Sequence, residues 1–390
     1  MPWKDTRVMD QRIEFLVQAK QRVASLAQLC REHGISRQTG YGWLRRLEAC
    51  GSFTGLQERS RRPRHSPTQT PAALEARVVV LRDEYGWGAR KLQVLLANEG
   101  VQLGEWSINR ILRRRGRMEP RPVRGQARQR FVREEPNQLH QLDFKGEYAL
   151  AQGWCYPLSL LDDHSRYLVG LWPLPSLALT GVQEALAGLF REQGVPEALL
   201  MDRGTPWWST TNGHGLTRLS VWLMNQDIEL IYGRPYHPQT RGKVERFHRT
   251  LKARTWHEGL PPDLESWRRW APRFRQEYNQ VRPHEALGMR CPSQAYSSQN
   301  LRPYREQPTP WVYPTGVVQR LNTQGCLRWR GRRWFVCEAL AGEPVCVEET
   351  EHLVVVSYRA MAIRELDLRT HDTRALVLRL PSPKVSTMSC

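Results

Sequence analysis

Hydrophobic positions repeat with different periods along the chain, and the changes of period divide it into parts. Up to about residue 116, apolar residues recur at helical spacing in two clusters, residues 8–49 and 72–116. From residue 139 to 232 they form short apolar or alternating runs with helical patterns between them. From Trp311 onward only short strand-like runs separated by turns remain. The sequence therefore predicts a helical part, an α/β part and a β part.

The first helical cluster, residues 8–49, predicts three short helices. The turn Gly34-Ile35 precedes the third helix, and Ser36 is its expected N-cap. Two short helices joined by such a turn are typical of a helix-turn-helix, whose last helix enters the major groove of DNA. A plain three-helix bundle is the alternative. If the cluster binds DNA, the side chains expected to face it are Arg37, Gln38, Thr39 and Tyr41.

The second helical cluster, residues 72–116, breaks at Gly86-Trp87-Gly88. After this break an apolar face resumes, and Ser107 is the expected cap of a final helix over residues 108–115. This pattern also predicts a helix-turn-helix. Two such units in tandem would let one chain read an extended DNA sequence.

Two stretches of the helical part lack hydrophobic periodicity. Residues 51–71 are rich in Ser, Thr, Pro and Arg, which predicts a linker in which Arg61 and Arg62 are candidates for minor-groove contacts. Residues 110–133 contain ten Arg and one Glu, too much charge to bury a core. We expect this run to stay extended until it meets phosphate, and a solvated connector is the alternative. Its candidate DNA contacts are Arg113, Arg114 and Arg115.

The charge of the whole chain supports a nucleic-acid partner. The sequence has 58 Lys and Arg against 39 Asp and Glu, a net charge of +19 with a pI near 10.1. For a soluble protein such an excess favours a polyanion. A membrane-surface protein is the alternative, but no apolar run has spanning length and the N-terminus lacks a signal-peptide core. The eight Cys include no Cys-x-x-Cys pair, which argues against a zinc ribbon and for a reducing cytosol.

Three acids of the α/β part lie in unusual sequence surroundings. Asp143 lies within an expected apolar strand and Asp202 directly follows another, where ionised carboxylates are rare without a partner. Glu245 opens a helix whose expected buried face contains Val244, Phe247, His248 and Leu251. The alternative for Glu245 is a surface pair with Arg249, which contributes roughly 0.2–0.5 kcal/mol. Three converging carboxylates need a cation, and hard oxygen ligands suit magnesium or manganese.

These acids and their neighbours resemble the integrase core of DDE transposases, which are bacterial insertion-sequence enzymes related to retroviral integrases. The resemblance covers roughly residues 135–295. It differs from the family at Arg203 and Arg241, where Asn is usual. The residues that carry it are Asp143, Asp202-Arg203-Gly204, His237-Pro238-Gln239-Thr240-x-Gly242-Lys243-Val244-Glu245-Arg246, and the Asn-x-x-Arg-Pro-His pattern of Asn279 to His284.

The resemblance implies a ribonuclease H-like fold with the element order β-β-β-α-β-α-β-α, in which the first and fourth strands are neighbours. The expected strands are Leu139–Tyr148, Trp154–Leu161, Arg166–Leu174, Ala198–Met201 and Ile228–Tyr232, with helices over Thr180–Gln193 and Leu216–Gln226. In this arrangement Asp143, Asp202 and Glu245 are the catalytic and metal-binding residues, with two Mg²⁺ (or Mn²⁺) ions in each active site. Asp162 and Asp163, at a turn, are interpreted as structural.

The implied function is DNA transposition: binding of element ends, metal-dependent 3′-end cleavage and strand transfer into target DNA. The partners would be double-stranded DNA and further copies of the chain, as a dimer or higher oligomer, in the bacterial cytoplasm at the nucleoid and without a membrane. The alternatives are a non-catalytic DNA-binding regulator derived from a transposase and a metal-dependent nuclease of the same fold.

Several further side chains of the core are candidate DNA contacts. Two interpretations apply to Trp207 and Trp208: they would stack on bases of DNA, or they would anchor a long loop in the core. His237 would contact DNA or only form its turn. The remaining candidates are Gln239, Arg241, Lys243, Arg249 and Lys252.

The last part predicts a small antiparallel β-barrel, with Arg330, Arg332 and Arg333 on one hairpin as a candidate DNA clamp or a solvated turn. The tail beyond about residue 371 has little pattern and is expected to be disordered. The complete expectation is a multidomain chain of all-α helix-turn-helix units, an α/β ribonuclease H-like core and a β-barrel. Its predicted boundaries are 1–66, 67–133, 134–295, 296–370 and 371–390.

Overall fold

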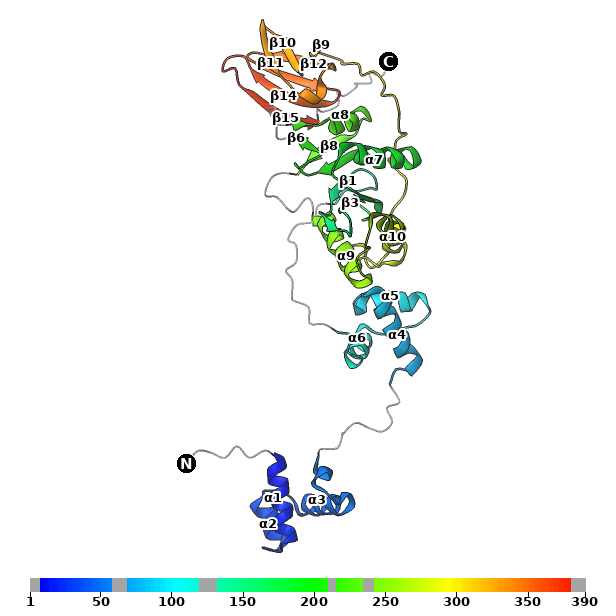
Figure 1. The fold of residues 1–390 in the computed structure, drawn as a ribbon, viewed down its shortest axis with the longest axis vertical. Helices are drawn as coiled ribbons and strands as arrows, with labels where there is room; N and C mark the ends of the chain where they lie inside the picture. The colour runs from blue at the N-terminus through cyan, green and yellow to red at the C-terminus, as the bar shows by residue number, and fades with distance from the viewer. Residues whose placement is uncertain (1–7, 58–68, 119–131, 210–214, 234–241, 380–390) are drawn as a thin grey trace, which may run out of the picture. The chain divides into compact units, whose positions relative to one another are not determined.

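The structure is a computed structural model that describes residues 8–57, 69–118, 132–209, 215–233 and 242–379 (Figure 1). Contacts divide the chain into two compact units, residues 1–70 and 71–390. Within the described ranges, no helix is both long and apolar enough to cross a membrane.

The first unit contains the three predicted helices. They are α1 (Val8–Lys20), α2 (Leu26–Glu32) and α3 (Arg37–Cys50), followed by a 3₁₀ turn at Phe53–Leu56. Ser36 caps α3 as predicted, since its Oγ accepts the backbone N–H of Thr39 at 3.1 Å. Helix α3 packs closely on the others at Gly40, where a Cβ atom would lie 2.6 Å from Sγ of Cys30. Any larger residue at this position would push the helices apart.

The second unit begins with a three-helix group of its own. The helices are α4 (Ala72–Tyr85), α5 (Ala89–Asn98) and α6 (Glu105–Arg114), and their apolar faces meet around Val78, Leu92 and Ile108. The prediction that Ser107 caps the last helix is wrong. The extended residue before α6 is Gly104, whose carbonyl accepts the N–H of Ser107 at 3.0 Å, so Ser107 lies inside the first turn.

A six-stranded mixed sheet forms the centre of the second unit. Its strands are β1 (His140–Phe144), β2 (Tyr148–Ala149), β3 (Trp154–Asp162), β4 (Leu168–Leu174), β5 (Ala198–Met201) and β8 (Glu229–Tyr232). The order is β2-β3-β1-β5-β8, with β4 also paired to β3. The first and fourth predicted strands, β1 and β5, are parallel neighbours, as expected. Two short strands, β6 (Trp208–Ser209) and β7 (Gly215–Leu216), pair outside this sheet.

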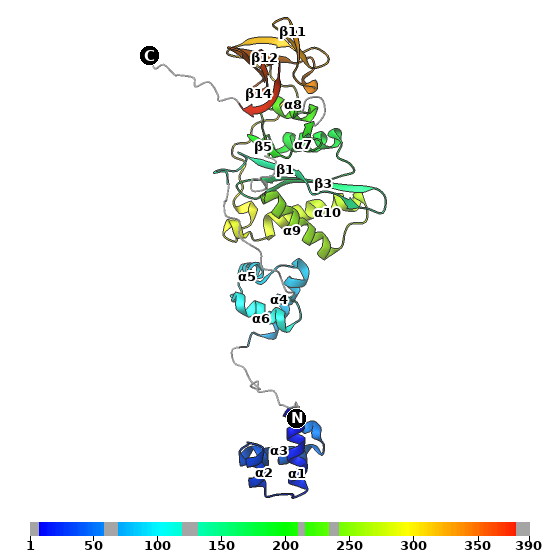
Figure 2. The same cartoon turned by 90° about the vertical axis from the view of Figure 1, so that its left-hand side faces the viewer.

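Helices cover both faces of the sheet. On one face lie α7 (Leu179–Gln193) and α8 (Arg218–Asn225), and on the other lie α9 (Gly242–Glu258) and α10 (Leu264–Gln276), which continues into a π turn at Glu277–Val281 (Figure 2). The two hydrophobic clusters are correspondingly separate. Val182, Leu186 and Leu219 pack on the first face, and Phe247, Leu251 and Trp267 pack on the second.

The C-terminal strands form an open sheet. It runs in the order β15-β14-β13-β12-β9, and β10 pairs only with β11. Among the described residues the sheets do not close, so the predicted barrel is not confirmed. These strands are β9 (Val317–Arg320), β10 (Cys326–Trp329), β11 (Arg332–Phe335), β12 (Pro344–Thr350), β13 (Leu353–Tyr358), β14 (Met361–Asp367) and β15 (Thr373–Arg379).

The prediction of a disordered tail beyond residue 371 is wrong for residues 373–379, which form β15 and pair with β14. A tight turn makes this pairing possible, since Asp367 Oδ1 accepts the N–H groups of Arg369 and Thr370. The C-terminal strands also pack on the core. Tyr358 donates its hydroxyl to Asn225 Oδ1 at 2.7 Å, and Arg359 pairs with Asp227 at 2.9 Å. One hydrophobic cluster extends through both regions.

Candidate active site

Asp143 lies on β1, and Asp202 directly follows β5, the parallel neighbour of β1. In the pairing of β1 with β5, His140 is opposite Leu199 and Gln141 is opposite Leu200. Continuing this register by two residues brings Asp143 opposite Asp202. Neighbouring strands are roughly 4.8 Å apart, so we expect the backbones of Asp143 and Asp202 to lie close together. Asp143 is 9% exposed, and Oδ1 of Asp202 accepts the backbone N–H of Gly204 at 3.1 Å.

The third acid, Glu245, is exposed in the first turn of α9. This turn lies against β1, since the N–H of Val244 donates to Oε1 of Gln141 at 3.2 Å. One turn later, His248 Nδ1 is 3.7 Å from Asp143 Oδ2. Helix α9 therefore brings Glu245 to the strand that carries Asp143. Across the part of the chain that the structure describes, no three His, Cys, Asp or Glu side chains are grouped closely enough to hold a metal ion as they stand.

A buried serine and histidine support Asp143 from behind. Ser159 on β3 donates its Oγ–H to the carbonyl oxygen of Asp143 at 2.9 Å, and its Oγ lies 2.9 Å from His248 Nε2. Because the single hydroxyl proton is used on the carbonyl, His248 Nε2 is the donor in the second bond. The sequence placed His248 on the buried face of its helix but gave no sign of this pair, since Ser159 is 89 residues away in the chain.

A lysine directly after β1, Lys145, was also missed. Gln141, Asp143 and Lys145 alternate along the strand, so they share one face of the sheet. Burial lowers the pKa of Lys145, the charge of Lys252 lowers it further, and the charge of Asp143 raises it. The period-two repetition of polar residues was the available signal for Lys145. Lys252 itself is exposed on α9, as is Arg249.

Lys243 is turned inward, which does not support its expected role in contacting DNA. Its ammonium group lies 2.5 Å from Oδ1 of Asp163, and its side chain is only 14% exposed. The pKa of Lys243 is lowered to about 8, because the lowering by burial and by Arg166 outweighs the raising by Asp163. Asp162 is fully buried as well, and its Oδ2 accepts from Ser165 N and Oγ. The structural interpretation of Asp162 and Asp163 agrees with these contacts.

The tryptophans after Asp202 favour the anchoring alternative. Trp207 is 1% exposed and stacks on Phe144 with ring centroids 5.8 Å apart. Trp208 is half-buried against Tyr232, and the guanidinium of Arg203 lies over its ring at 5.1 Å. A fully buried ring offers no face to a base, so Trp207 anchors its loop in the core.

The expected contacts of the first helical unit are all exposed on α3. They are Arg37, Gln38, Thr39 and Tyr41, and the Thr39 hydroxyl also bonds Ser36 Oγ at 2.8 Å. Five further candidates lie outside the described residues: Arg61, Arg62, His237, Gln239 and Arg241.

The arginines at the end of α6 separate into two kinds. Arg114 and Arg115 both pair with Glu75 of α4, whose side chain is 4% exposed. Arg113 is exposed on the face of the helix that also carries Arg110 and Trp106. Trp106 is 89% exposed, and the other face of α6 is buried. The sequence did not single out Trp106, although an apolar ring outside the apolar stripe was a visible signal.

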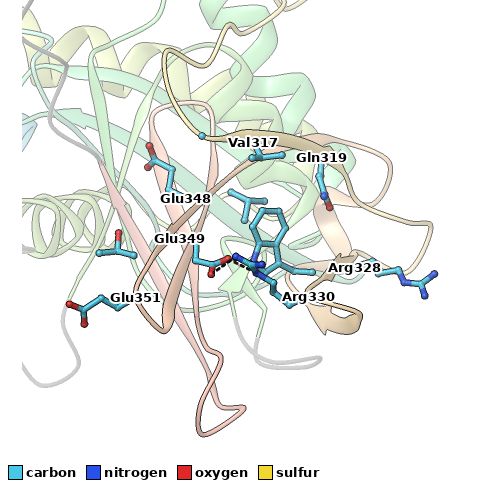
Figure 3. A pocket seen from close by; sticks show the side chains of 11 residues that line it. Val317, Gln319, Arg328, Arg330, Glu348, Glu349 and Glu351 are labelled. Atoms are coloured by element: carbon cyan, nitrogen blue, oxygen red, sulfur yellow. Dashed lines mark hydrogen bonds and ion pairs between the residues drawn. The ribbon is translucent and has the colours of Figure 1, made fainter.

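The C-terminal hairpin presents a mixed surface (Figure 3). Arg330 Nη2 lies 3.0 Å from Oε1 of Glu349, and Trp329 Nε1 donates to Oε2 of the same carboxylate at 2.7 Å. The hydrogen bond from Arg330 is the main reason that the pKa of Glu349 is lowered. A groove of about 980 Å³ beside this pair is lined by acids as well as arginines. Arg332 and Arg333 are exposed, so of the three predicted arginines only Arg330 is neutralised by a neighbour in the described structure.

Comparisons with protein families match the helical part and the α/β part of the chain. Two descriptions of the integrase core domain match residues 133–238 and 226–292. A helix-turn-helix domain matches residues 11–64, and a homeodomain-like domain matches residues 39–112.

Similar proteins come from insertion elements and retroviruses. The chain is 28% identical over 242 residues to the uncharacterised 39.2 kDa protein of insertion element IS476 of Xanthomonas euvesicatoria, covering 59% of this chain and 67% of that protein. It is 26% identical over 235 residues to the uncharacterised 31.7 kDa protein of insertion element IS407 of Burkholderia multivorans, covering 58% and 82%. A Pro-Pol polyprotein of simian foamy virus type 3 is 28% identical over 111 residues, 28% of this chain and 9% of the polyprotein.

Two solved structures are similar to this chain at lower sequence identity. The simian T-cell lymphotropic virus intasome in complex with the PP2A regulatory subunit B56 gamma has 16% identity and a TM-score of 0.37, covering 71% of this chain and 91% of that chain. The HTLV-2 integrase catalytic core domain in complex with magnesium has 14% identity and a TM-score of 0.31, covering 42% and 97%.

Proposed function

Because this chain carries an integrase core domain together with helix-turn-helix domains, we propose that it is a DNA transposase that binds element ends, cleaves their 3′ ends and joins them to target DNA. The observation that supports the proposal most is the parallel pairing of β1 with β5, because its register, continued by two residues, would bring Asp143 opposite Asp202. The contact of Val244 with Gln141 holds the first turn of α9, which carries Glu245, to the same strand.

The three carboxylates suit a divalent cation, since oxygen ligands of this kind are preferred by Mg²⁺ and Mn²⁺. Asp143, Asp202 and Glu245 would hold two ions. When bound, the ions would stabilise the charge on the attacking and leaving oxygens of an in-line displacement. The chain's own contribution is to orient the ligands: the Gly204 N–H holds the carboxylate of Asp202, and Ser159, itself bonded to His248, holds the backbone carbonyl of Asp143.

Two displacements at phosphorus then account for the reaction. Water displaces the 3′ oxygen at the element end and frees a 3′-hydroxyl, which in turn displaces a 3′ oxygen of the target strand. No covalent intermediate with the protein is needed. Lys145, two residues after Asp143, and Lys252, exposed on α9 seven residues after Glu245, would hold the phosphate that is attacked.

DNA binding is assigned to the exposed faces of α3 and α6. Trp106, Arg110 and Arg113 line one face of α6 while its other face is buried, which suits the major groove. Synapsis of two element ends would require at least two copies of the chain. Action on chromosomal DNA would place the protein in the bacterial cytoplasm, at the nucleoid.

The test offers labelled element-end duplex and a target plasmid, with Mg²⁺, to the full chain and to Asp143→Asn. We expect wild type to give cleaved and joined products and Asp143→Asn to give neither, with DNA binding nearly unchanged. Cleavage without joining would identify a nuclease of the same fold, and binding without cleavage a regulator. Joining by Asp143→Asn at the wild-type rate would contradict the assignment of the site.

A further inference from the structure

A buried polar cluster joins three segments behind the three acids. Its centre is Asp163, at the turn after β3, which is fully buried. Oδ1 of Asp163 accepts from Gln141 Nε2 at 2.8 Å and lies 2.5 Å from Lys243 Nζ. Its Oδ2 accepts the N–H of Arg133 at 2.8 Å, and its carbonyl accepts from Lys243 Nζ at 3.0 Å. Every oxygen of this residue therefore has a defined donor.

The same cluster fastens the start of α9 to β1. The first N–H groups of a helix have no partner inside the helix. Here the N–H of Val244 is satisfied by Oε1 of Gln141, while the other end of the same amide is held by Asp163. Lys243, in the same turn, adds an ion pair. Helix α9 thus begins with two directional contacts to residues about 80 and 103 positions earlier in the chain.

Each contact is adjacent to a catalytic candidate. Gln141 precedes Asp143 by two residues on the same face of β1, and Lys243 precedes Glu245 by two residues in the first turn of α9. The apolar contacts of Val244, Phe247 and Leu251 also hold α9, but hydrophobic contacts are non-directional and tolerate small shifts. Hydrogen bonds and a buried ion pair require one geometry.

We propose that Gln141, Asp163 and Lys243 form a positioning latch that sets the first turn of α9, and with it Glu245, relative to Asp143. This inference rests on the proposed function of the three acids. In this proposal the latch residues act through the residues they hold.

A buried ion pair is a poor source of stability, because the cost of removing two charges from water offsets most of their attraction. Replacing both charged partners together leaves no buried charge without its partner, so the double substitution should disturb the fold less than either single one while the ion pair is lost. This separates positioning from folding, and it makes the double substitution Asp163→Asn with Lys243→Met the informative variant.

The experiment compares this double variant with wild type in the full chain. Two readouts are followed: kcat and KM for cleavage of element-end duplex, and the shift in melting temperature caused by Mn²⁺ without DNA. We expect kcat to fall and the Mn²⁺ concentration for half-maximal stabilisation to rise, each by about 10- to 100-fold, the range typical of residues that orient metal ligands. KM for DNA should stay within about threefold. The single variant Lys243→Arg keeps the positive charge. Its kcat and its Mn²⁺ response should therefore both lie between those of wild type and those of the double variant.

The matched control is Asp227→Asn with Arg359→Met. It removes a second partly buried ion pair, which joins the C-terminal strands to the core rather than α9 to β1. It should leave the Mn²⁺ response unchanged. If the latch double variant fails to fold, Gln141→Leu tests the same contact without removing a charge, and the same loss of Mn²⁺ response is expected.

A wild-type kcat and Mn²⁺ response in the variant that folds would overturn the latch. The variant Glu245→Gln tests the proposed function separately from the latch. If Glu245→Gln is inactive while the latch variant is normal, only the latch is wrong. If Glu245→Gln keeps full activity, the proposed function is wrong as well.

Discussion

Helices α6 and α9 are both basic, and each carries one acid in its first turn, yet those acids have different surroundings. Glu105 of α6 lies 3.5 Å from Arg90, and both side chains are largely exposed. Glu245 of α9 begins a turn that is fastened to β1, next to Asp143. A first-turn acid favours any helix through its dipole. Only α9 is held next to another candidate acid, so only its first-turn acid is also a candidate for catalysis.

The basic residues of each helix also fall into two groups: those paired with a buried carboxylate and those that face solvent. In α6, Arg114 is held by the buried Glu75 while Arg113 is exposed. In α9, Lys243 is held by the buried Asp163 while Lys252 is exposed. We therefore expect that a basic run does not contact DNA as a whole. The members paired with a buried carboxylate stabilise the fold, and the others are the candidates for phosphate contacts.

The largest difference between the two helices should appear when their acids are neutralised. Glu245→Gln should reduce cleavage and joining by about 10³-fold or more, because groups that act as a unit lose most of their effect together. Glu105→Gln removes only a surface pair, typically worth about 0–1 kcal/mol, and should leave the rate within about twofold. Both are measured with labelled element-end duplex and Mg²⁺. Equal effects of the two substitutions would remove the distinction between the helices.

The next largest effect concerns the buried acid that holds the bases of α6. Glu75→Gln keeps the size of the side chain but removes the charge that Arg114 and Arg115 share. Losing hydrogen bonds to a charged group should cost about 1.5–3 kcal/mol locally. We expect amide hydrogen exchange in α4 to α6 to speed up by roughly 10- to 150-fold, while exchange in α9 is unchanged. Unchanged protection in α4 to α6 would mean that Glu75 does not stabilise this unit.

Much of the framework was predictable from the sequence, because local patterns determine it. Strand β5 has the predicted bounds Ala198–Met201, since a continuous apolar run ends there at Asp202. The adjacency of β1 and β5 came from the family resemblance. Strand β15 was missed because its pairing depends on a turn at Asp367 rather than on a strong alternating pattern.

The candidate site was predictable only for the acids themselves. What surrounds them is set by contacts between distant segments. Lys243 has the sequence neighbours of a DNA contact, and only its distance to Asp163, 80 residues earlier, reveals the buried pair. Ser159 likewise looks like an ordinary strand residue until His248 is placed beside it. No local pattern encodes such pairs, since the side chains meet through the topology of the sheet.

The smallest expected effect gives the finest test of the comparison. Arg113→Ala should weaken DNA binding at every sequence and reduce the slope of log affinity against log salt by about one, because one phosphate contact is lost. Arg114→Ala should leave that slope unchanged, since Arg114 is held by Glu75, and should instead loosen α4 to α6 in hydrogen exchange. Titrations of a duplex of fixed length at several salt concentrations measure both. If the two substitutions lower the slope equally, the buried carboxylate does not withhold Arg114 from DNA, and the division of the basic run by its partners has to be abandoned.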